Sequence, residues 1–87
     1  MYRILTKDIN RTTVTTILDK YLDGYTLVKA RGVWKGKAED SLIIEIDFPT
    51  KTVIDCDIVH RIANLIREVN KQECVLVQKI ECESSLI

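Results

Sequence analysis

The order of hydrophobic patterns along this chain is the feature that most constrains its fold. Residues 2–6, 25–34, 41–48 and 73–80 are rich in β-type residues or alternate between apolar and polar positions, as strands do. Between them, apolar residues recur three and four positions apart over 14–22 and 58–69, which is the spacing of one face of a helix. The sequence therefore predicts the order strand, helix, strand, strand, helix, strand.

With right-handed crossovers, this order produces a ferredoxin-like βαββαβ fold. It is an α+β fold in which a four-stranded antiparallel sheet carries two helices on one face. In the third strand Leu42, Ile44 and Ile46 point to one face, and Ile43 and Glu45 point to the other. We expect the helices to cover the first face, and a ligand, a protein partner or a second subunit to lie on the open face.

Local signals predict where these elements end. Asn10 is a good N-cap for the first helix, and Gly24 can supply the left-handed residue that ends it. The second helix is expected over about 55–70. Residues 35–40 form a polar connection, which predicts a hairpin with a slightly long tip. The nearly continuous apolar stretch within 73–80 predicts a last strand inside the sheet.

Length and composition restrict the class of protein. The 87 residues predict a single domain, 1–87, in which 81–87 form a C-terminal tail. Because 13 Lys and Arg balance 13 Asp and Glu, the chain lacks the net positive field of a nucleic-acid-binding protein. The three cysteines include no CxxC pair, and no apolar run approaches the roughly 18 residues of a membrane span. We expect a soluble, cytoplasmic protein without nucleic-acid or membrane partners.

Residue patterns that carry known catalytic chemistry are absent from this sequence. There is no nucleophile elbow, phosphate loop or dinucleotide glycine fingerprint. His60 has Cys56 and Asp57 within one helical turn, but a solvent-facing helix with mixed polar residues explains all three better than a metal site does. Cys74 lies in an apolar strand, where a thiol is usually an inert small hydrophobe. These observations predict a protein that is not an enzyme and that needs no metal or cofactor.

The hairpin carries the most distinctive segment, residues 29–37, with the only Trp, four cations and two glycines. Lys and Arg side chains at such a tip can bind an anion, and a Trp ring can stack on a ligand. We therefore predict a ligand site formed by Arg31, Trp34, Lys35 and Lys37. The alternative is that Trp34 packs across the hairpin and the lysines keep a sheet edge soluble.

Three segments, GYTLVKARGVWKG, SLIIEI and IANLIREVNKQECVLV, carry a resemblance that spans roughly residues 2–80. They resemble small proteins of bacteriophages and bacterial mobile elements and, more weakly, a PII-like, ferredoxin-like bacterial family of unknown function. The recognisable parts are Gly-x-Trp-x-Gly at 32–36 and Asn-x-Gln-Glu at 70–73. The resemblance implies a homo-oligomer that associates through the sheet face and binds small ligands between subunits. The hairpin tip is far shorter than in PII signalling proteins, so ATP and 2-oxoglutarate binding of the PII kind is not implied.

Two functions follow from these observations. The first is a non-enzymatic, oligomeric binding or regulatory protein, phage-encoded, that holds a small anionic ligand such as a nucleotide. The alternative is a protein-interaction module or inhibitor that binds a host protein through the open sheet face or an edge strand.

Overall fold

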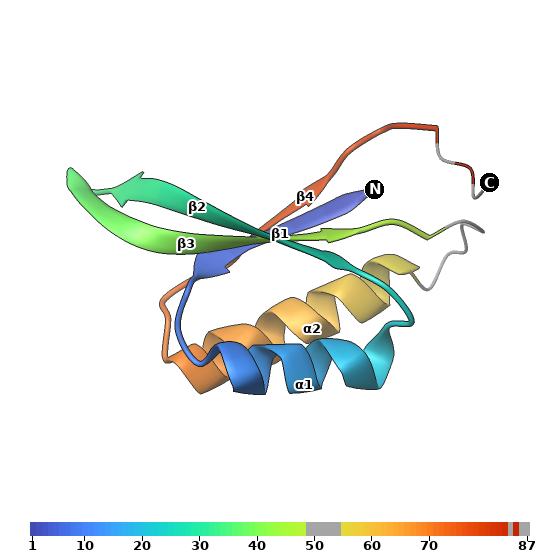
Figure 1. Cartoon of the computed structure of the whole chain (residues 1–87), viewed down its shortest axis with the longest axis horizontal. Helices are drawn as coiled ribbons and strands as arrows, with labels where there is room; N and C mark the ends of the chain where they lie inside the picture. The colour runs from blue at the N-terminus through green and yellow to red at the C-terminus, as the bar shows by residue number, and fades with distance from the viewer. Residues whose placement is uncertain (49–54, 84, 86–87) are drawn as a thin grey trace.

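The computed structural model describes residues 1–48, 55–83 and 85. Its elements are β1 (Tyr2–Lys7), α1 (Arg11–Tyr21), β2 (Thr26–Trp34), β3 (Lys37–Ile46), α2 (Asp55–Asn70) and β4 (Leu76–Lys79). The strands form one sheet in the order β2-β3-β1-β4, in which all neighbours are antiparallel. Both helices lie on the same face of this sheet (Figure 1). The predicted ferredoxin-like α+β fold is confirmed.

The core lies between the two helices and one face of the sheet. Alternate residues of β1 and β3 point into it, and Ile4, Leu42, Ile44 and Ile46 are at most 1% exposed. The predicted assignment of the two faces of β3 is therefore correct. The helices close the core with a row of buried aliphatic side chains: Val14, Leu18, Val59, Ile62 and Ile66.

The stripe of α2 differs slightly from the predicted one. Val59 and Ala63 are buried, whereas Val69, which the sequence placed on the stripe, is 37% exposed. Apolar residues occupy an arc of this helix that is wider than one contact stripe, and packing against α1 and the sheet selects which part of the arc is buried.

The connection between β2 and β3 is a turn of two residues, Lys35 and Gly36. Both have positive φ, 51° and 78°, as a tight turn matched to the twist of a hairpin requires. Residues 37–40 pair with 31–34, so the prediction of a longer tip over 35–40 is wrong. The sequence did not indicate this pairing because residues 37–40 are mostly polar. The hairpin extends past the helices (Figure 1), so its side chains there contact no core and no alternation of apolar residues is required.

Replacing Gly36 with alanine is expected to cost about 1–2 kcal/mol of unfolding free energy, because an L-residue with a Cβ is strained at positive φ. No atom lies within 4 Å of the Cβ that would be added, so the strain comes from the backbone alone. Gly24→Ala is the matched control, because its Cβ also meets open space and Gly24 lies outside the positive-φ region. Urea unfolding of both variants measures the difference, and equal stabilities would contradict the tight turn.

The connection from α1 to β2 also departs from the prediction. α1 ends at Tyr21, and Leu22 takes an extended conformation while its N–H donates to the Leu18 carbonyl at 2.9 Å. Because the chain leaves the helix in an extended conformation, no left-handed residue is needed and the predicted role of Gly24 is wrong. After Gly24, the Tyr25 hydroxyl donates a hydrogen bond to the Asp19 carboxylate at 2.7 Å, and this hydrogen bond raises the pKa of Tyr25.

β4 lies at the edge of the sheet and pairs only with β1, so the predicted interior position is wrong. It is also shorter than the predicted 73–80. The α2 crossover carries the chain past β1 to its free side, and that topology decides the position of β4 whatever its hydrophobicity. Val77 packs on the core, while Leu76 is 53% exposed on the open face.

The N-terminal residue lies beside the residue that follows β4. Met1 and Ile80 exchange two backbone hydrogen bonds, which continue the pairing of β1 with β4. The sequence also predicts that Pro49 ends the third strand, that Val53 and Ile54 could extend the start of the second helix, and that the tail ends in the apolar pair Leu86 and Ile87. These residues lie outside the described part of the chain. In the part that is described, no helix has the length and apolar character needed to cross a membrane.

Candidate functional site

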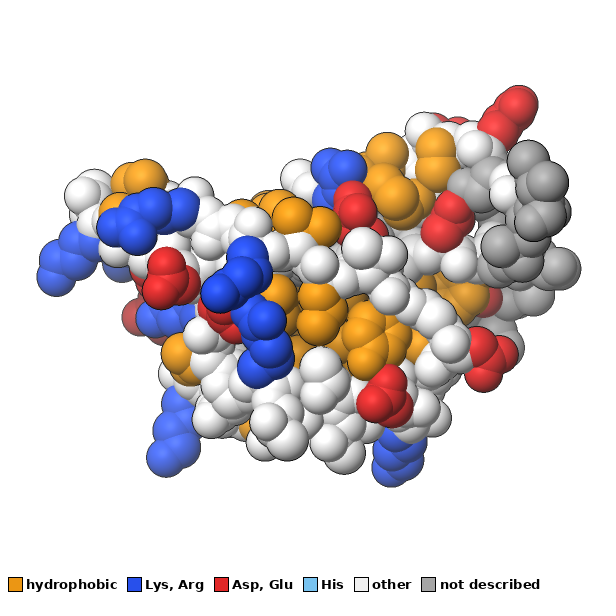
Figure 2. Space-filling view, viewed as in Figure 1, with side chains coloured by type: hydrophobic (Ala, Val, Ile, Leu, Met, Phe, Trp, Pro, Cys, Tyr) orange, Lys and Arg blue, Asp and Glu red, His pale blue; other side chains and the backbone are white. Residues whose placement is uncertain are grey.

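A cavity of about 670 Å³ lies on the face of the sheet that the helices leave open. Its floor is formed by the side chains that alternate with the core residues of β1 and β3, among them Leu5, Ser41 and Ile43. The β2–β3 hairpin forms one wall, and the turn between α2 and β4 forms the other. Figure 2 shows Lys and Arg side chains gathered at the hairpin end of the molecule.

Gly32 makes room for the Ser41 side chain on the floor of the cavity. It pairs with Glu39 on the open face, and a Cβ added at this position would lie 2.6 Å from the Ser41 hydroxyl. A larger residue would therefore displace Ser41 or close part of the floor. Glycine here lets the Ser41 side chain lie against the strand backbone.

The walls combine apolar surface with charges of both signs. Glu39 and Glu73 supply carboxylates, and Lys7 and Lys71 supply ammonium groups. The Lys7 ammonium lies 3.9 Å from a carboxylate oxygen of Glu39, across the floor between β1 and β3. A molecule that carries both positive and negative groups beside an apolar part would find partners for all of them in this cavity.

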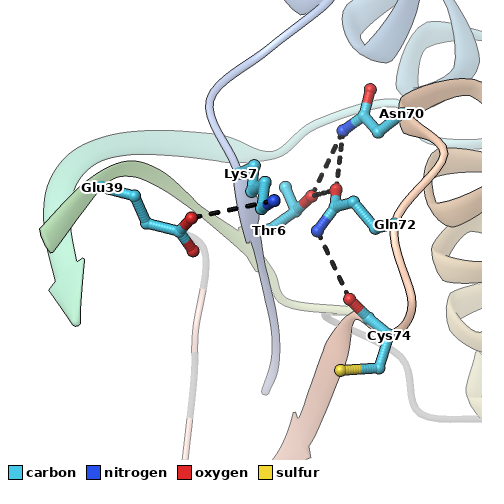
Figure 3. A network of polar contacts seen from close by, with 6 residues as sticks. All are labelled: Thr6, Lys7, Glu39, Asn70, Gln72 and Cys74. Carbon is cyan, nitrogen blue, oxygen red and sulfur yellow. Dashed lines mark hydrogen bonds and ion pairs between the residues drawn. The ribbon is translucent and has the colours of Figure 1, made fainter. Parts of the chain in front are cut away.

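A network of hydrogen bonds holds the turn between α2 and β4 against the end of β1 (Figure 3). Thr6 donates to Gln72 Oε1 at 2.5 Å, and Asn70 Nδ2 donates to the same oxygen at 2.9 Å. Asn70 Nδ2 also lies 3.4 Å from the Thr6 hydroxyl. Gln72 Nε2 donates to the Cys74 carbonyl at 3.3 Å. Thr6 and Asn70 are 5% and 7% exposed, so buried partners orient the Gln72 amide.

Asn10 extends this network to the start of α1. Asn10 takes the predicted N-cap position, where its carbonyl accepts from the Val14 N–H at 2.9 Å, but its backbone is left-handed and its side chain makes no cap bond. It donates instead to Asn70 Oδ1 at 3.2 Å and to the Val69 carbonyl at 3.3 Å. The physical reason is position: Asn10 lies against the last turn of α2, whose carbonyl groups lack partners within the helix.

The end of α2 holds a strained residue at the rim of the cavity. Lys71 has φ 53°, and the N–H groups of Lys71 and Gln72 donate to the carbonyls of Glu68 and Arg67, which is a Schellman motif. Glycine usually occupies the position that Lys71 takes. Strained backbone of this kind persists where the surrounding contacts hold it, and such sites cluster where ligands bind.

The four side chains predicted as a ligand site take different positions. Trp34 is 54% exposed at the hairpin wall, and the Lys35 ammonium lies 5.9 Å from its ring centre. Arg31 contributes to the cavity wall and lies 3.7 Å from Asp40. Lys37 is not among the lining residues. The structure thus brings Arg31, Trp34 and Lys35 to one cavity, and their role in binding stays a prediction.

Sequence reasoning missed the opposite wall of the cavity. Gln72 and Glu73 entered the sequence analysis only as part of Asn-x-Gln-Glu, without a predicted role; in the structure Gln72 bonds to β1 and to its own turn. Cys74 was placed inside a strand as an inert hydrophobe, but it precedes β4 and is an exposed residue of the cavity wall. The Asn-x-Gln-Glu spacing was the one signal in the sequence that marked this segment.

The histidine of α2 lies away from the cavity. His60 Nδ1 lies 2.8 Å from the Cys56 carbonyl and 3.4 Å from its sulfur, on an exposed turn of the helix. Among residues 1–48, 55–83 and 85, no three His, Cys, Asp or Glu side chains gather as metal ligands would.

Fold and cavity together define a ferredoxin-like protein whose open sheet face carries a cavity lined by apolar, acidic and basic side chains. Among solved structures, the chain is similar to a phage SAM lyase in complex with S-methyl-5′-thioadenosine, at 26% identity and a TM-score of 0.69, over 87% of this chain and 75% of that one. It is also similar to a phage SAM lyase in the apo state, at 28% identity and a TM-score of 0.68, over 87% and 74% of the two chains. No family model and no curated protein matches the sequence.

These comparisons confirm the resemblance to phage proteins and correct the predicted function. A lyase is an enzyme, so the predictions of a non-enzymatic binding protein and, as its alternative, of a protein-interaction module are wrong. The ligand of the first neighbour is a nucleoside without a phosphate, unlike the anion that was expected. None of the comparisons supports the PII-like part of the resemblance.

Proposed function

We propose that this chain is an enzyme that cleaves S-adenosylmethionine (SAM) and releases S-methyl-5′-thioadenosine. The observation that carries the proposal is the likeness to two phage SAM lyase structures, one of them bound to that nucleoside, over 87% of this chain. The cavity on the open sheet face, about 670 Å³ in volume, is within the size range of small-molecule sites.

The chemistry of the cavity walls suits SAM. The substrate combines an adenosine with a sulfonium, an ammonium and a carboxylate group. Trp34 offers a ring on which the adenine stacks. Glu39 and Glu73 offer carboxylates to the two cationic groups, and Lys71 offers a cation to the carboxylate. Leu5 and Ile43 provide an apolar floor beneath the reacting carbon–sulfur bond.

The proposed reaction breaks the bond between the sulfonium and the carbon chain of the methionine moiety. The electron pair of this bond goes to sulfur, and neutral S-methyl-5′-thioadenosine leaves. Since a lyase adds no water, the four-carbon fragment either closes on itself through its own carboxylate or forms an alkene by giving a proton to a carboxylate of the cavity, Glu39 or Glu73. The substrate supplies its own leaving group, so no protein nucleophile is consumed. An apolar floor favours this step, because positive charge on sulfur disappears as the bond breaks.

Incubation of the purified chain with SAM in ¹⁸O-labelled water tests the proposal. We expect S-methyl-5′-thioadenosine in an amount equal to the SAM consumed, and a four-carbon product without ¹⁸O at early times, both measured by mass spectrometry. A hydrolase would place ¹⁸O in that product. Lys20→Ala, on α1 outside the cavity lining, is the control and should cleave SAM like the wild type. A folded wild-type chain that leaves SAM intact would overturn the proposal.

Assembly of copies through the open sheet face stays a prediction. Val28, Trp34 and Leu76 on this face are 39%, 54% and 53% exposed, which is apolar surface that a second copy could cover. Light scattering of the purified chain measures the oligomeric state, and a monomer at high concentration would contradict it. A cytoplasmic location also stays a prediction.

A further inference from the structure

The Gln72 amide is a fixed hydrogen-bond donor on the wall of the cavity. Its Oε1 accepts from Thr6 at 2.5 Å and from Asn70 at 2.9 Å, so the oxygen end of the amide is held in place by two donors. The Thr6 hydroxyl could also accept, but rotation of the amide by half a turn would put its NH₂ group against the NH₂ group of Asn70. The orientation of Asn70 is set in turn by Asn10, whose Nδ2 donates to Asn70 Oδ1 and to the Val69 carbonyl. The network therefore assigns the orientation of Gln72.

One N–H of this amide is left for a ligand. The nitrogen of a glutamine amide carries two hydrogens, and Gln72 gives one to the Cys74 carbonyl at 3.3 Å. In the described part of the chain, no second acceptor is bonded to Nε2. Because Gln72 lines the cavity, the remaining N–H is available to an acceptor bound there.

The position of Trp34 indicates which end of the substrate meets Gln72, because cations line both walls of the cavity, Arg31 and Lys35 on the hairpin and Lys71 beside Gln72. Lys71 precedes Gln72 on the same wall, and Lys7 contributes to the floor on β1, next to Thr6. Trp34, which suits the adenine, belongs to the hairpin wall on the other side. An elongated ligand with its base on the hairpin wall therefore has its amino-acid end beside α2 and β4. A carboxylate there accepts charge-assisted bonds from both Lys and the amide.

Resting on the proposed function, we propose that Gln72 binds the carboxylate of SAM, and that Thr6 and Asn70 are positioning residues that fix its amide. The three act as one unit. Thr6 and Asn70 hold the oxygen, which directs the nitrogen toward the substrate. The left-handed residue Lys71 brings the turn close enough to β1 for these bonds to form.

Two probes separate the ends of the substrate. S-Adenosylhomocysteine carries the amino-acid end but no sulfonium, so this reaction does not cleave it, and S-methyl-5′-thioadenosine lacks that end. In Gln72→Glu, Thr6 and Asn70 still have an acceptor, but the donor is lost and a negative charge faces the ligand. We expect its affinity for S-adenosylhomocysteine to fall about 10- to 100-fold, by calorimetry, and its affinity for S-methyl-5′-thioadenosine to change less than about twofold.

The positioning role has its own variants. Thr6→Val keeps the shape of the side chain and removes the donor, and it should weaken S-adenosylhomocysteine binding several-fold while sparing the nucleoside. Thr6→Ser restores the hydroxyl and should restore the affinity. A role in folding alone would not distinguish the two probes, and thermal unfolding of each variant measures that role separately.

The outcomes are distinct. Equal loss for both probes in Gln72→Glu, or no loss for either, overturns the assignment of Gln72 while the proposed function stands. Wild-type affinity for S-adenosylhomocysteine in Thr6→Val overturns the positioning role. A wild-type chain that binds neither probe and leaves SAM intact overturns the proposed function, and this inference with it.

Discussion

Replacing Trp34 with alanine is expected to weaken binding of S-methyl-5′-thioadenosine by about 5- to 150-fold. Stacking of a base on an aromatic ring contributes about 1–3 kcal/mol, and this fold-change is its equivalent. Trp34 is 54% exposed on the cavity wall, so its ring is accessible to a ligand. Calorimetry with the nucleoside measures the change directly, independent of turnover.

Two further variants make this result specific. Trp34→Phe keeps a ring and should keep most of the affinity, whereas Lys20→Ala on α1 should bind like the wild type. If Trp34→Ala binds the nucleoside as the wild type does but unfolds at a lower temperature, Trp34 packs across the hairpin and has no role in binding. That was the alternative that its place in the sequence left open.

The second large effect concerns stability. Ile44→Ala is expected to lower the free energy of unfolding by about 2–5 kcal/mol, since Ile44 is 0% exposed and its removal leaves a cavity in the core. Small domains have only about 5–15 kcal/mol in total, so this loss is a large share of the stability. Urea unfolding monitored by circular dichroism gives the value.

The neighbouring residue is the matched control. Ile43 has the same side chain but points to the open face, where it is partly exposed in the cavity floor. Ile43→Ala should therefore cost much less stability than Ile44→Ala. Equal losses would mean that both faces of β3 are buried in solution, as they would be if copies of the chain associate through the open face.

The proposed reaction explains why no catalytic motif marked this sequence as an enzyme. Known catalytic motifs contain protein nucleophiles, metal ligands or phosphate loops, and enzymes use these groups on substrates that need activation. A sulfonium is already an activated leaving group, so the protein needs only to bind, orient and partly dehydrate it. The residues proposed for this task, Glu39, Gln72 and Trp34, are ordinary polar and aromatic side chains, and their types and spacing do not distinguish them from surface residues.

The segments themselves show what periodicity can and cannot predict. The alternation at 41–48 correctly assigned Ile43 and Ile44 to opposite faces, because the direction of a strand side chain depends on local geometry. The hairpin turn at Lys35 and Gly36 was missed, because polar residues outside the core carry no such pattern. The edge position of β4 was missed because the packing of the α2 crossover on the sheet, and not the hydrophobicity of β4, decides which strands lie next to β4.

By itself, the sequence determined the order of the elements, the face of β3 that enters the core and hence the face left open. Those properties depend on residues a few positions apart. The cavity depends on contacts such as that between Thr6 and Gln72, which are 66 positions apart in the chain. Only the tertiary structure decided the contact between Thr6 and Gln72. The path of α2 across the sheet and the left-handed turn at Lys71 bring these two residues together, and no local sequence pattern encodes that path or that turn.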